Sequence, residues 1–406
     1  MNWDSLFAER TKQMKRSTVR EILKLTSKPE VISFAGGLPA PELFPIERIR
    51  EATDTVLQER GQEAMQYSTT EGMPELRELI ARRLSAGSLK ISPNNILITS
   101  GSQQAIDMIA RIFLDEGDSV IVENPTYVGM MTSWRPFYLN FLAVPTDNDG
   151  LIVDELEPLL AQNPKIMYSI PTFQNPMGTT LTRERRTKLA QLLTKYNVPF
   201  VEDNPYGELR YSGDPVPSVL EMEAAARGST TVDGSVIYTG TFSKVLTPGL
   251  RIAWVVAHEA VIDKLVQVKQ ATDLHTSTFN QFVSYEVARD DEFLAEHVKM
   301  LRNVYRQRRD LMLQTMEGNF PQEVTWTKPE GGLFLMVTMP EHLNARDVLK
   351  EALAQNVAFV PCDDFFIGDA GHNTFRLNFS NSRPERIVEG IQRLGAVLKD
   401  AVLQPS

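Results

Sequence analysis

The sequence predicts an α/β protein with two domains, the larger of which is built on a mainly parallel sheet. The chain has 406 residues, more than one hydrophobic core usually serves. Between residues 48 and 290, helical patterns alternate with short, nearly continuous apolar runs. That alternation is typical of parallel strands covered by helices on both faces. After residue 290 the pattern changes, which indicates a second, smaller α/β domain.

The predicted strands of the large domain are short runs rich in apolar residues. They are "NILITS" (95–100), "SVIVEN" (119–124), "KIMYSI" (165–170), "PFVED" (199–203), "SVIYTG" (235–240) and "RIAWVVA" (251–257). Helical patterns occupy 47–60, 73–86, 103–114, 182–196 and 259–271. We therefore expect residues 48–290 to form the large domain.

The remaining segments have their own patterns. In "STVREILKLT" (17–26), Thr18 and Glu21 have the spacing of a capping box, which predicts a short helix. We expect an N-terminal arm and helix over 1–30, a segment over 31–47 that packs with the small domain, and a small domain over 291–406. The predicted elements of that domain are helices at 291–316, 345–355 and 384–401 and strands at 331–339, 357–361 and 374–380.

Composition excludes several kinds of partner. The 42 basic and 52 acidic residues give a net charge of −10, which argues against a nucleic-acid partner. A single cysteine, Cys362, excludes a cysteine-based structural metal site, and the wide spread of the 5 histidines argues against a histidine cluster, so we expect no metal. No window has the roughly 18–20 apolar residues of a membrane span, and the charged N-terminus does not resemble a signal peptide. We expect no membrane partner and a cytoplasmic protein.

Polar loops follow strand after strand of the large domain. They are "SGSQQ", "NPTY", "PTFQNP", "DNPY" and "GTFSK". In an open parallel sheet the carboxyl ends of the strands share one edge, and ligands bind there. If these strands are parallel, the five loops form a ligand site.

The first of these loops leads into a helix near Ser102, in "SGSQQAIDMIARIF" (100–113). Free N–H groups in the first turn of that helix, together with the Ser102 hydroxyl, would hold a phosphate. The alternative is a tight turn in which Ser102 caps the helix.

The stretch "YTGTFSKVLTPGLRIAW" (238–254) places Lys244 after a strand, at the same edge. A lysine there can form a Schiff base with a carbonyl compound if desolvation or a nearby cation lowers its pKa. Arg251 is a candidate for that cation and for a phosphate clamp. Thr241 and Ser243 would add hydroxyl donors to the anion. The alternatives are a solvated lysine and ordinary turn chemistry.

Four further side chains follow strands at this edge. Asp203 ends an apolar strand, and a buried carboxylate needs a partner such as a protonated ring nitrogen; the alternative is a cap. Tyr206 lies three residues later. Asn175 precedes a proline, where a simple turn is the alternative, and Tyr127 either stacks on a flat ring or closes a loop.

Arg376 lies in the alternating strand "NTFRLNFS" (373–380), between two apolar residues. An inward arginine must meet an anion, because an unpaired buried charge is very costly. That anion is either a substrate carboxylate or an internal Asp or Glu.

Taken together, these motifs resemble one family. The order DNPY and FQNP upstream, TFSK followed by Arg251, and FRLNFS downstream is similar to the fold-type-I aminotransferases that use pyridoxal 5′-phosphate (PLP). The resemblance covers nearly the entire chain and implies a seven-stranded sheet. "STVREILKLT…FAGGLPAPELFP", "QYSTTEGMPELR" and "TDLHT" (272–276) resemble the branch that contains 2-aminoadipate (LysN-type) and kynurenine aminotransferases and the aminotransferase-like part of MocR regulators.

The resemblance also implies a role for each candidate residue. Lys244 would bond the cofactor and move protons, Asp203 would pair with the ring nitrogen, and Asn175 and Tyr206 with the ring hydroxyl. The other implied contacts of the cofactor come from Ser102, Gln103, Thr241, Ser243 and Arg251 around the phosphate, from Tyr127 on the ring, and from Tyr67 of a neighbouring subunit. The last contact implies a homodimer with shared active sites.

For the substrate, the resemblance implies that Arg376, Gly37 and Asn175 hold the α-carboxylate, while Ser17 and Arg20 contact a distal carboxylate. The expected reaction transfers the α-amino group of an L-amino acid to a 2-oxo acid such as 2-oxoglutarate, by a ping-pong mechanism. The expected donors are 2-aminoadipate or glutamate-like amino acids, and also aromatic or branched-chain ones. Alternatives are a decarboxylase or β-lyase on the same fold, or a MocR-like regulator, which would need a DNA-binding domain before residue 1.

Overall fold

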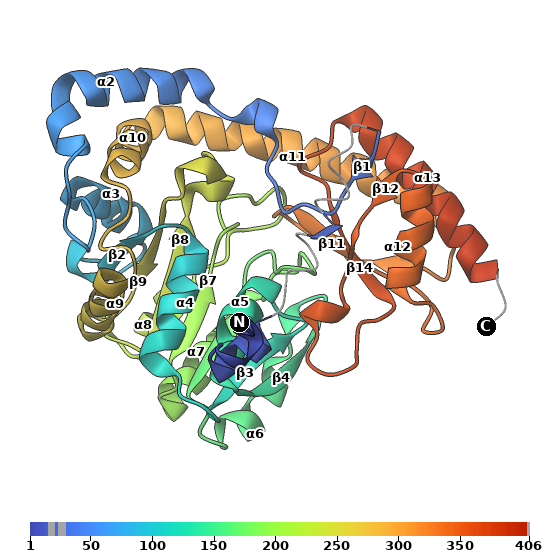
Figure 1. Ribbon diagram of the computed structural model, residues 1–406, viewed down its shortest axis with the longest axis horizontal. Coiled ribbons are helices and arrows are strands. Elements are labelled where there is room, and N and C mark those ends of the chain that lie inside the picture. Colours follow the sequence, from blue (N-terminus) through green and yellow to red (C-terminus); the bar gives the residue numbers. More distant parts are fainter. Residues whose placement is uncertain (15–20, 23–29, 404–406) are drawn as a thin grey trace.

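The computed structural model describes residues 1–14, 21–22 and 30–403 (Figure 1). The substrate candidates Ser17 and Arg20 lie outside these residues. Of the predicted helix over 17–26, only residues 21 and 22 are described, and both are helical.

The central feature is an eight-stranded sheet with the order β2-β9-β8-β7-β6-β3-β4-β5. Its strands are β2 (Ile96–Thr99), β3 (Ser119–Asn124), β4 (Asn140–Asp147), β5 (Gly150–Leu151), β6 (Ile166–Ser169), β7 (Phe200–Asp203), β8 (Val236–Thr241) and β9 (Ala253–Val256). Within the run β8-β7-β6-β3-β4 of the sheet, each strand is parallel to its neighbour. The strand β9 is antiparallel to both β8 and β2. The α/β fold with a mainly parallel sheet is thus confirmed.

Two sheet strands were not among the runs predicted from the sequence. The strand β4 lies near the edge of the sheet, and its residues are mostly only partly buried. A strand of that kind lacks the continuous apolar run of the central strands. The two-residue β5 pairs with β4 as a short hairpin and adds an eighth strand to the seven implied by the family resemblance.

Helices cover both faces of this sheet (Figure 1). Those of the large sheet region are α2 (Ile46–Ala64), α3 (Pro74–Leu84), α4 (Ser102–Phe113), α5 (Val128–Trp134), α6 (Glu157–Leu160), α7 (Arg183–Tyr196), α8 (Val219–Ala226), α9 (Glu259–Thr272) and α10 (Thr278–Ala288). The helices α5, α6, α8 and α10 were not predicted. The first three are short, and α10 buries polar side chains such as Gln281, which weakens any apolar periodicity.

The long helix α11 (Asp291–Asn319) leads from the large sheet to a second group of elements (Figure 1). Its buried face includes Leu294, Leu301, Tyr305 and Met312, which recur at helical spacing. The group holds an antiparallel sheet of order β10-β11-β14-β13 and two further helices. These elements are β10 (Thr325–Trp326), β11 (Phe334–Thr338), β13 (Val360–Pro361), β14 (Thr374–Asn378), α12 (Ala345–Ala354) and α13 (Pro384–Leu403).

The segment before α2 lies against this second group. The strand β1 (Ile32–Ser33) pairs in parallel with β12 (Val357–Ala358), and the Ala40 N–H donates to the Tyr305 hydroxyl over 3.1 Å. These two contacts hold the backbone around Gly37 between the large sheet and the second group of elements. In the described part of the chain, no helix is long and apolar enough to cross a membrane.

Two helical glycines test the packing of α11 against α13. A Cβ on Gly395 of α13 would lie 2.8 Å from the Asn319 carbonyl oxygen of α11, so Gly395→Ala should cost about 1–3 kcal/mol of unfolding free energy. Gly318 has no atom within 4 Å of its Cβ position, so Gly318→Ala should stabilise by about 0.5–1 kcal/mol. Thermal and urea unfolding of both variants measures the two effects; equal shifts would contradict the close packing.

Candidate active site

The site lies at the edge where the predicted loops meet. The strand β2 is antiparallel to β9, and β9 is antiparallel to β8, so β2 runs in the same direction as β3, β6, β7 and β8. All five carboxyl ends therefore share one edge, as the sequence predicted. The strand β9 starts at that edge and runs away from it. Arg251, two residues before the start of β9, therefore also lies at that edge.

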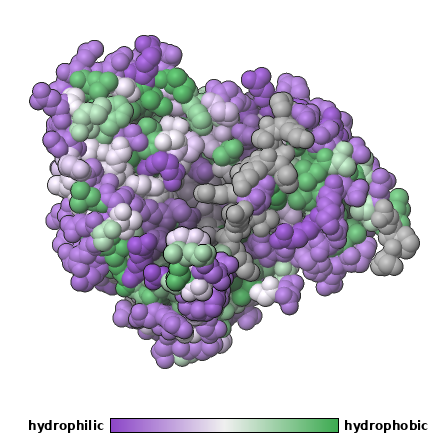
Figure 2. All heavy atoms as spheres, in the orientation of Figure 1, coloured by the Kyte–Doolittle hydropathy of each residue, from purple (hydrophilic) through white to green (hydrophobic). Residues whose placement is uncertain are grey.

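These loops surround a cavity of about 1060 Å³. Figure 2 shows the surface hollowed near the centre of its view, where hydrophilic residues predominate. The predicted site residues that line the cavity are Gly37, Ser102, Gln103, Tyr127, Asn175, Asp203, Tyr206, Thr241, Ser243, Lys244, Arg251 and Arg376. The sequence did not single out Phe334 and Phe365, which also line it. Both belong to the second group of elements and carry no polar signal.

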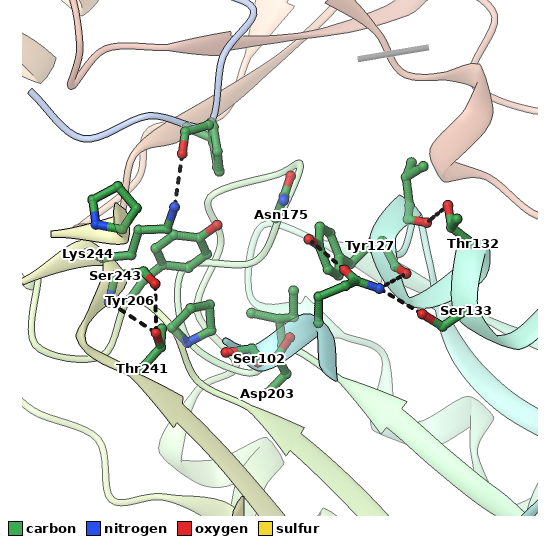
Figure 3. Close-up of a pocket in the computed structure, with 18 of the residues that line it drawn as sticks. Ser102, Tyr127, Thr132, Ser133, Asn175, Asp203, Tyr206, Thr241, Ser243 and Lys244 are labelled. Carbon is green, nitrogen blue, oxygen red and sulfur yellow. Dashed lines mark hydrogen bonds between the residues drawn. The ribbon is translucent and has the colours of Figure 1, made fainter. Parts of the chain in front are cut away.

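Lys244 ends a short helical turn, η7 (Phe242–Lys244), directly after β8. Its Nζ donates to the Gly37 carbonyl oxygen over 2.9 Å (Figure 3). Removal of the ammonium from water, with smaller contributions from Arg376 and Arg251, lowers the pKa of Lys244 to about 8. The lysine is therefore not a solvated surface charge, and its amine is neutral at a lower pH than that of an ordinary lysine.

Arg376 is 3% exposed and lies on β14. Its guanidinium donates to the Asn175 Oδ1 over 2.7 Å and to the Ala35 carbonyl oxygen over 2.9 Å. It also lies over the Phe334 ring, 4.1 Å from the centroid. Among the described residues, no carboxylate forms an ion pair with Arg376, so the internal ion pair that the sequence left open is not found. The cation faces the cavity with hydrogen bonds to neutral groups alone.

Asp203 is the last residue of β7 and is 2% exposed. Its carboxylate accepts the Tyr168 hydroxyl over 2.6 Å and the Thr239 hydroxyl over 2.7 Å. Burial raises the pKa of Asp203, against the effect of these two hydrogen bonds. None of the helices in the described residues is capped by this carboxylate. Tyr168 and Thr239 were not predicted, although both lie on the strands next to β7, and Thr239 is directly opposite Asp203.

Three more side chains surround the middle of the cavity (Figure 3). The Tyr206 ring meets Phe334 edge to face, with the centroids 5.9 Å apart. Burial raises the pKa of Tyr206, opposed in part by a hydrogen bond with Asn175. The Tyr127 hydroxyl donates to the Gln103 Oε1 over 3.4 Å. The space between these side chains therefore fits a flat ring. The Tyr127 ring forms an aromatic wall, and Tyr206 and Asn175 supply two hydrogen-bonding groups.

A further part of the cavity lining, here called the anion cup, consists of Ser102, Thr241, Ser243 and Arg251. Gly101, with φ 88°, is the N-cap of α4, so Ser102 is the first helical residue and does not cap the helix. The Ser102 Oγ is buried and has no partner among the described residues. The Arg251 Nη2 donates to the Ser100 carbonyl oxygen over 3.3 Å. A Cβ on Gly101 would lie 2.0 Å from the Arg251 Nη2, so this close approach requires glycine.

Two hydroxyls complete the cup. The Thr241 Oγ1 donates to the Ser243 Oγ over 2.9 Å and accepts the Ser243 N–H over 3.0 Å. An orphaned hydroxyl, a helix N-terminus and a guanidinium together fit a phosphate group. Gln103 has another contact: its Nε2 donates to the Gly129 carbonyl oxygen and the Ser133 Oγ, each over 2.7 Å.

Tyr67 does not line this cavity. It is 79% exposed and contacts the His275 ring edge to face, with centroids 5.8 Å apart. Its place on the surface leaves its hydroxyl outside the site of its own chain.

Comparisons with known proteins agree with this geometry. Residues 29–394 match the family model described as aminotransferase class I and II. The chain belongs to this family. Its relatives include the 2-aminoadipate transaminase of Thermus thermophilus, 42% identical over 98% of each chain, and the aromatic-amino-acid aminotransferase 1 of Thermococcus litoralis, 42% identical over 98% of this chain and 95% of the relative.

Among solved structures, the fold is similar to that of LysN, the α-aminoadipate aminotransferase of Thermus thermophilus, complexed with N-(5′-phosphopyridoxyl)-L-leucine. The TM-score is 0.92 and the identity 40%, over 99% of each chain. The aminotransferase family to which the chain belongs uses PLP as its cofactor. The anion cup, Asp203 and Lys244 lie around one cavity, as this cofactor requires.

The lowered pKa of Lys244 gives a testable pH dependence. In the cofactor-free protein, pulse labelling with an amine-reactive acylating reagent should modify Lys244 with a midpoint near pH 8, because only the neutral amine reacts. The Arg376→Gln variant loses a neighbouring cation, so its midpoint should move to higher pH. Mass spectrometry of the Lys244 peptide, with the exposed Lys264 as the internal reference, measures both. A wild-type Lys244 midpoint near the pKa of an ordinary lysine, about 10.4, would contradict the desolvation of Lys244.

Proposed function

We propose that this protein transfers the α-amino group of an L-amino acid to a 2-oxo acid such as 2-oxoglutarate, with PLP bound in the cavity described above, in a ping-pong mechanism. The observation that carries the proposal is the partly buried Lys244, whose pKa is about 8, in one cavity with a buried carboxylate and a buried guanidinium. A reactive amine, a partner for a ring nitrogen and a carboxylate clamp are the three groups that such a reaction needs.

The residues fit each part of the cofactor. Ser102, Thr241, Ser243 and Arg251 would hold the phosphate in the anion cup, beside Gln103. Asp203 would accept a hydrogen bond from the ring nitrogen, Asn175 and Tyr206 would bond the ring hydroxyl, and Tyr127 would stack on the ring. When bound, PLP supplies an aldehyde that bonds amines and a ring that takes up the electron pair left at the substrate α-carbon.

The chain's own groups perform the proton transfer. With a pKa of about 8, roughly a tenth of the Lys244 amine is neutral at pH 7, far more than for an ordinary lysine. The neutral Nζ removes the α-proton as a general base and returns a proton as a general acid. Beside a cationic ring nitrogen, Asp203 would stay ionised, because its negative charge would then be compensated. The hydroxyls of Tyr168 and Thr239 hold its two oxygens in place.

Substrate selection divides between two regions. Arg376, with Asn175 and Gly37, would hold the α-carboxylate, and Ser17 and Arg20 would contact the distal group. We propose 2-aminoadipate or glutamate-like donors, and also aromatic or branched-chain donors. Support comes from the names of the relatives, which include a 2-aminoadipate transaminase and an aromatic-amino-acid aminotransferase.

We also propose a cytoplasmic homodimer with the domain division given above, in which Tyr67 reaches the phosphate of the neighbouring subunit. Large apolar side chains exposed in the single chain support a second copy. They include Leu38, Ile46, Met65 and Leu274, besides Tyr67 itself. Exposed apolar surface of this kind is typical of subunit interfaces.

Removal of Lys244 tests the reaction. The Lys244→Ala variant should lose at least about 10³-fold in kcat, because the base, acid and covalent attachment point are one side chain. A coupled assay with a panel of amino acids and 2-oxoglutarate measures transfer, and Lys264→Ala is the matched control. Undiminished transfer by Lys244→Ala would contradict the proposal. Release of CO₂, or of ammonia without transfer to 2-oxoglutarate, would indicate a decarboxylase or β-lyase.

Removal of Arg20 tests the preference for acidic donors. If Arg20 binds a distal carboxylate, Arg20→Ala should raise the KM for 2-aminoadipate by about tenfold or more and leave the KM for leucine nearly unchanged. Steady-state kinetics with both donors measures the difference. Equal increases for the two donors would reject the role of Arg20.

A further inference from the structure

One lysine of the large sheet region is wholly buried and takes no part in the cavity. Lys269 lies on α9, and its side chain is 0% exposed. Its Nζ donates to the Gln104 Oε1 over 2.8 Å and to the two Asp273 carboxylate oxygens over 2.9 and 3.0 Å. Gln104 is in the first turn of α4, so the ammonium joins α9 to the helix whose N-terminus forms the anion cup. These helices lie side by side in Figure 1.

The two partners of Lys269 also form hydrogen bonds with Ser100, in the turn that leads into the anion cup. The Ser100 N–H donates to the Gln104 Oε1 over 2.8 Å. The Ser100 hydroxyl donates to the Asp273 Oδ2 over 3.1 Å, and the Gln104 Nε2 donates to the same oxygen over 2.7 Å. The backbone and side chain of Ser100 are thus both held by the two groups that Lys269 holds.

The Ser100 carbonyl oxygen in turn positions the side chain of Arg251. It accepts the Arg251 Nη2 over 3.3 Å, on the side of the turn where Gly101 leaves room for the guanidinium. Lys269 therefore acts on two parts of the anion cup. It acts on the N-terminus of α4 through Gln104, and on Arg251 through Ser100.

We infer that Lys269, with Gln104 and Asp273, is a positioning device for the phosphate end of the cofactor site. This inference rests on the proposed binding of PLP. Lys269 does not line the cavity; it acts through the turn at Ser100 and through the guanidinium of Arg251.

The charge of Lys269 matters as much as its hydrogen bonds. Asp273 is an anion close to a site that binds an anion, and alone it would repel a phosphate. Lys269, whose own side chain is 0% exposed, compensates this charge at 2.9 Å, while the Asp273 side chain is 28% exposed. Replacement by an apolar residue of similar length leaves the Asp273 charge uncompensated and the Gln104 Oε1 without its strongest donor. Both effects weaken phosphate binding, and among the described residues Lys269 itself donates to Gln104 and Asp273 rather than to Asp203, Tyr206 or Lys244.

Comparison of ligands with and without a phosphate tests the inference. Equilibrium titration of the cofactor-free protein gives the Kd for PLP, pyridoxal and inorganic phosphate. In Lys269→Met, the Kd for PLP and for phosphate should rise about tenfold or more, while that for pyridoxal should change less than about twofold. In the matched control Lys264→Met, on the exposed face of the same helix, all three should be unchanged.

A milder variant guards against loss of folding in Lys269→Met. Ser100→Ala removes only the hydroxyl that bonds Asp273 and Thr276, and it should lower the preference for PLP over pyridoxal by about twofold or more. An unchanged preference in Ser100→Ala, or an equal loss for PLP and pyridoxal in Lys269→Met, would overturn the inference. If the wild-type protein itself bound no PLP, the proposed function would be the part that fails.

Discussion

The antiparallel pairing of β9 with β8 is the constraint on which the rest of the site depends. The strand β8 ends at the edge where the parallel strands also end, and β9 begins there. The segment between them starts and ends at that edge, and it places Lys244 and Arg251 in the cavity that Asp203 and Asn175 also line. One pairing thus brings the attacking amine, the anion cup and the ring contacts into a single cavity.

The charges around this cavity favour anions. Arg376 and Lys244 bond carbonyl oxygens and an amide, and the part of the chain that the structure describes offers neither of them an ion pair. Desolvated cations without counter-ions are costly, so a bound phosphate and a bound carboxylate would lower the free energy of the site. The same desolvation, with smaller contributions from the cations Arg376 and Arg251, lowers the pKa of Lys244. The feature that attracts the ligands therefore also activates the amine.

Much of the fold, and many of the residues that line the cavity, were predictable because they depend on local patterns. Central strands such as β7 and β8 are apolar on both faces, and their polar end residues are conspicuous in the sequence. The edge strand β4 and the short helix α5 lack such patterns and were missed. Tyr168 and Thr239 were missed because the register of neighbouring strands, which aims them at Asp203, is set by tertiary pairing. The Lys269 network was missed for the same reason, since its members come from two helices that meet only in the fold.

Borohydride trapping tests the central claim most directly. The claim is that Lys244 is the amine that reacts with the cofactor aldehyde at the edge of the sheet. Incubation with PLP, reduction with sodium borohydride and peptide mass spectrometry identify the lysine that carries the pyridoxyl group. The account predicts the label on the peptide that contains Lys244, at about one group per chain, and its absence after Lys244→Ala. A label on another lysine, or an equally labelled Lys244→Ala variant, would contradict it.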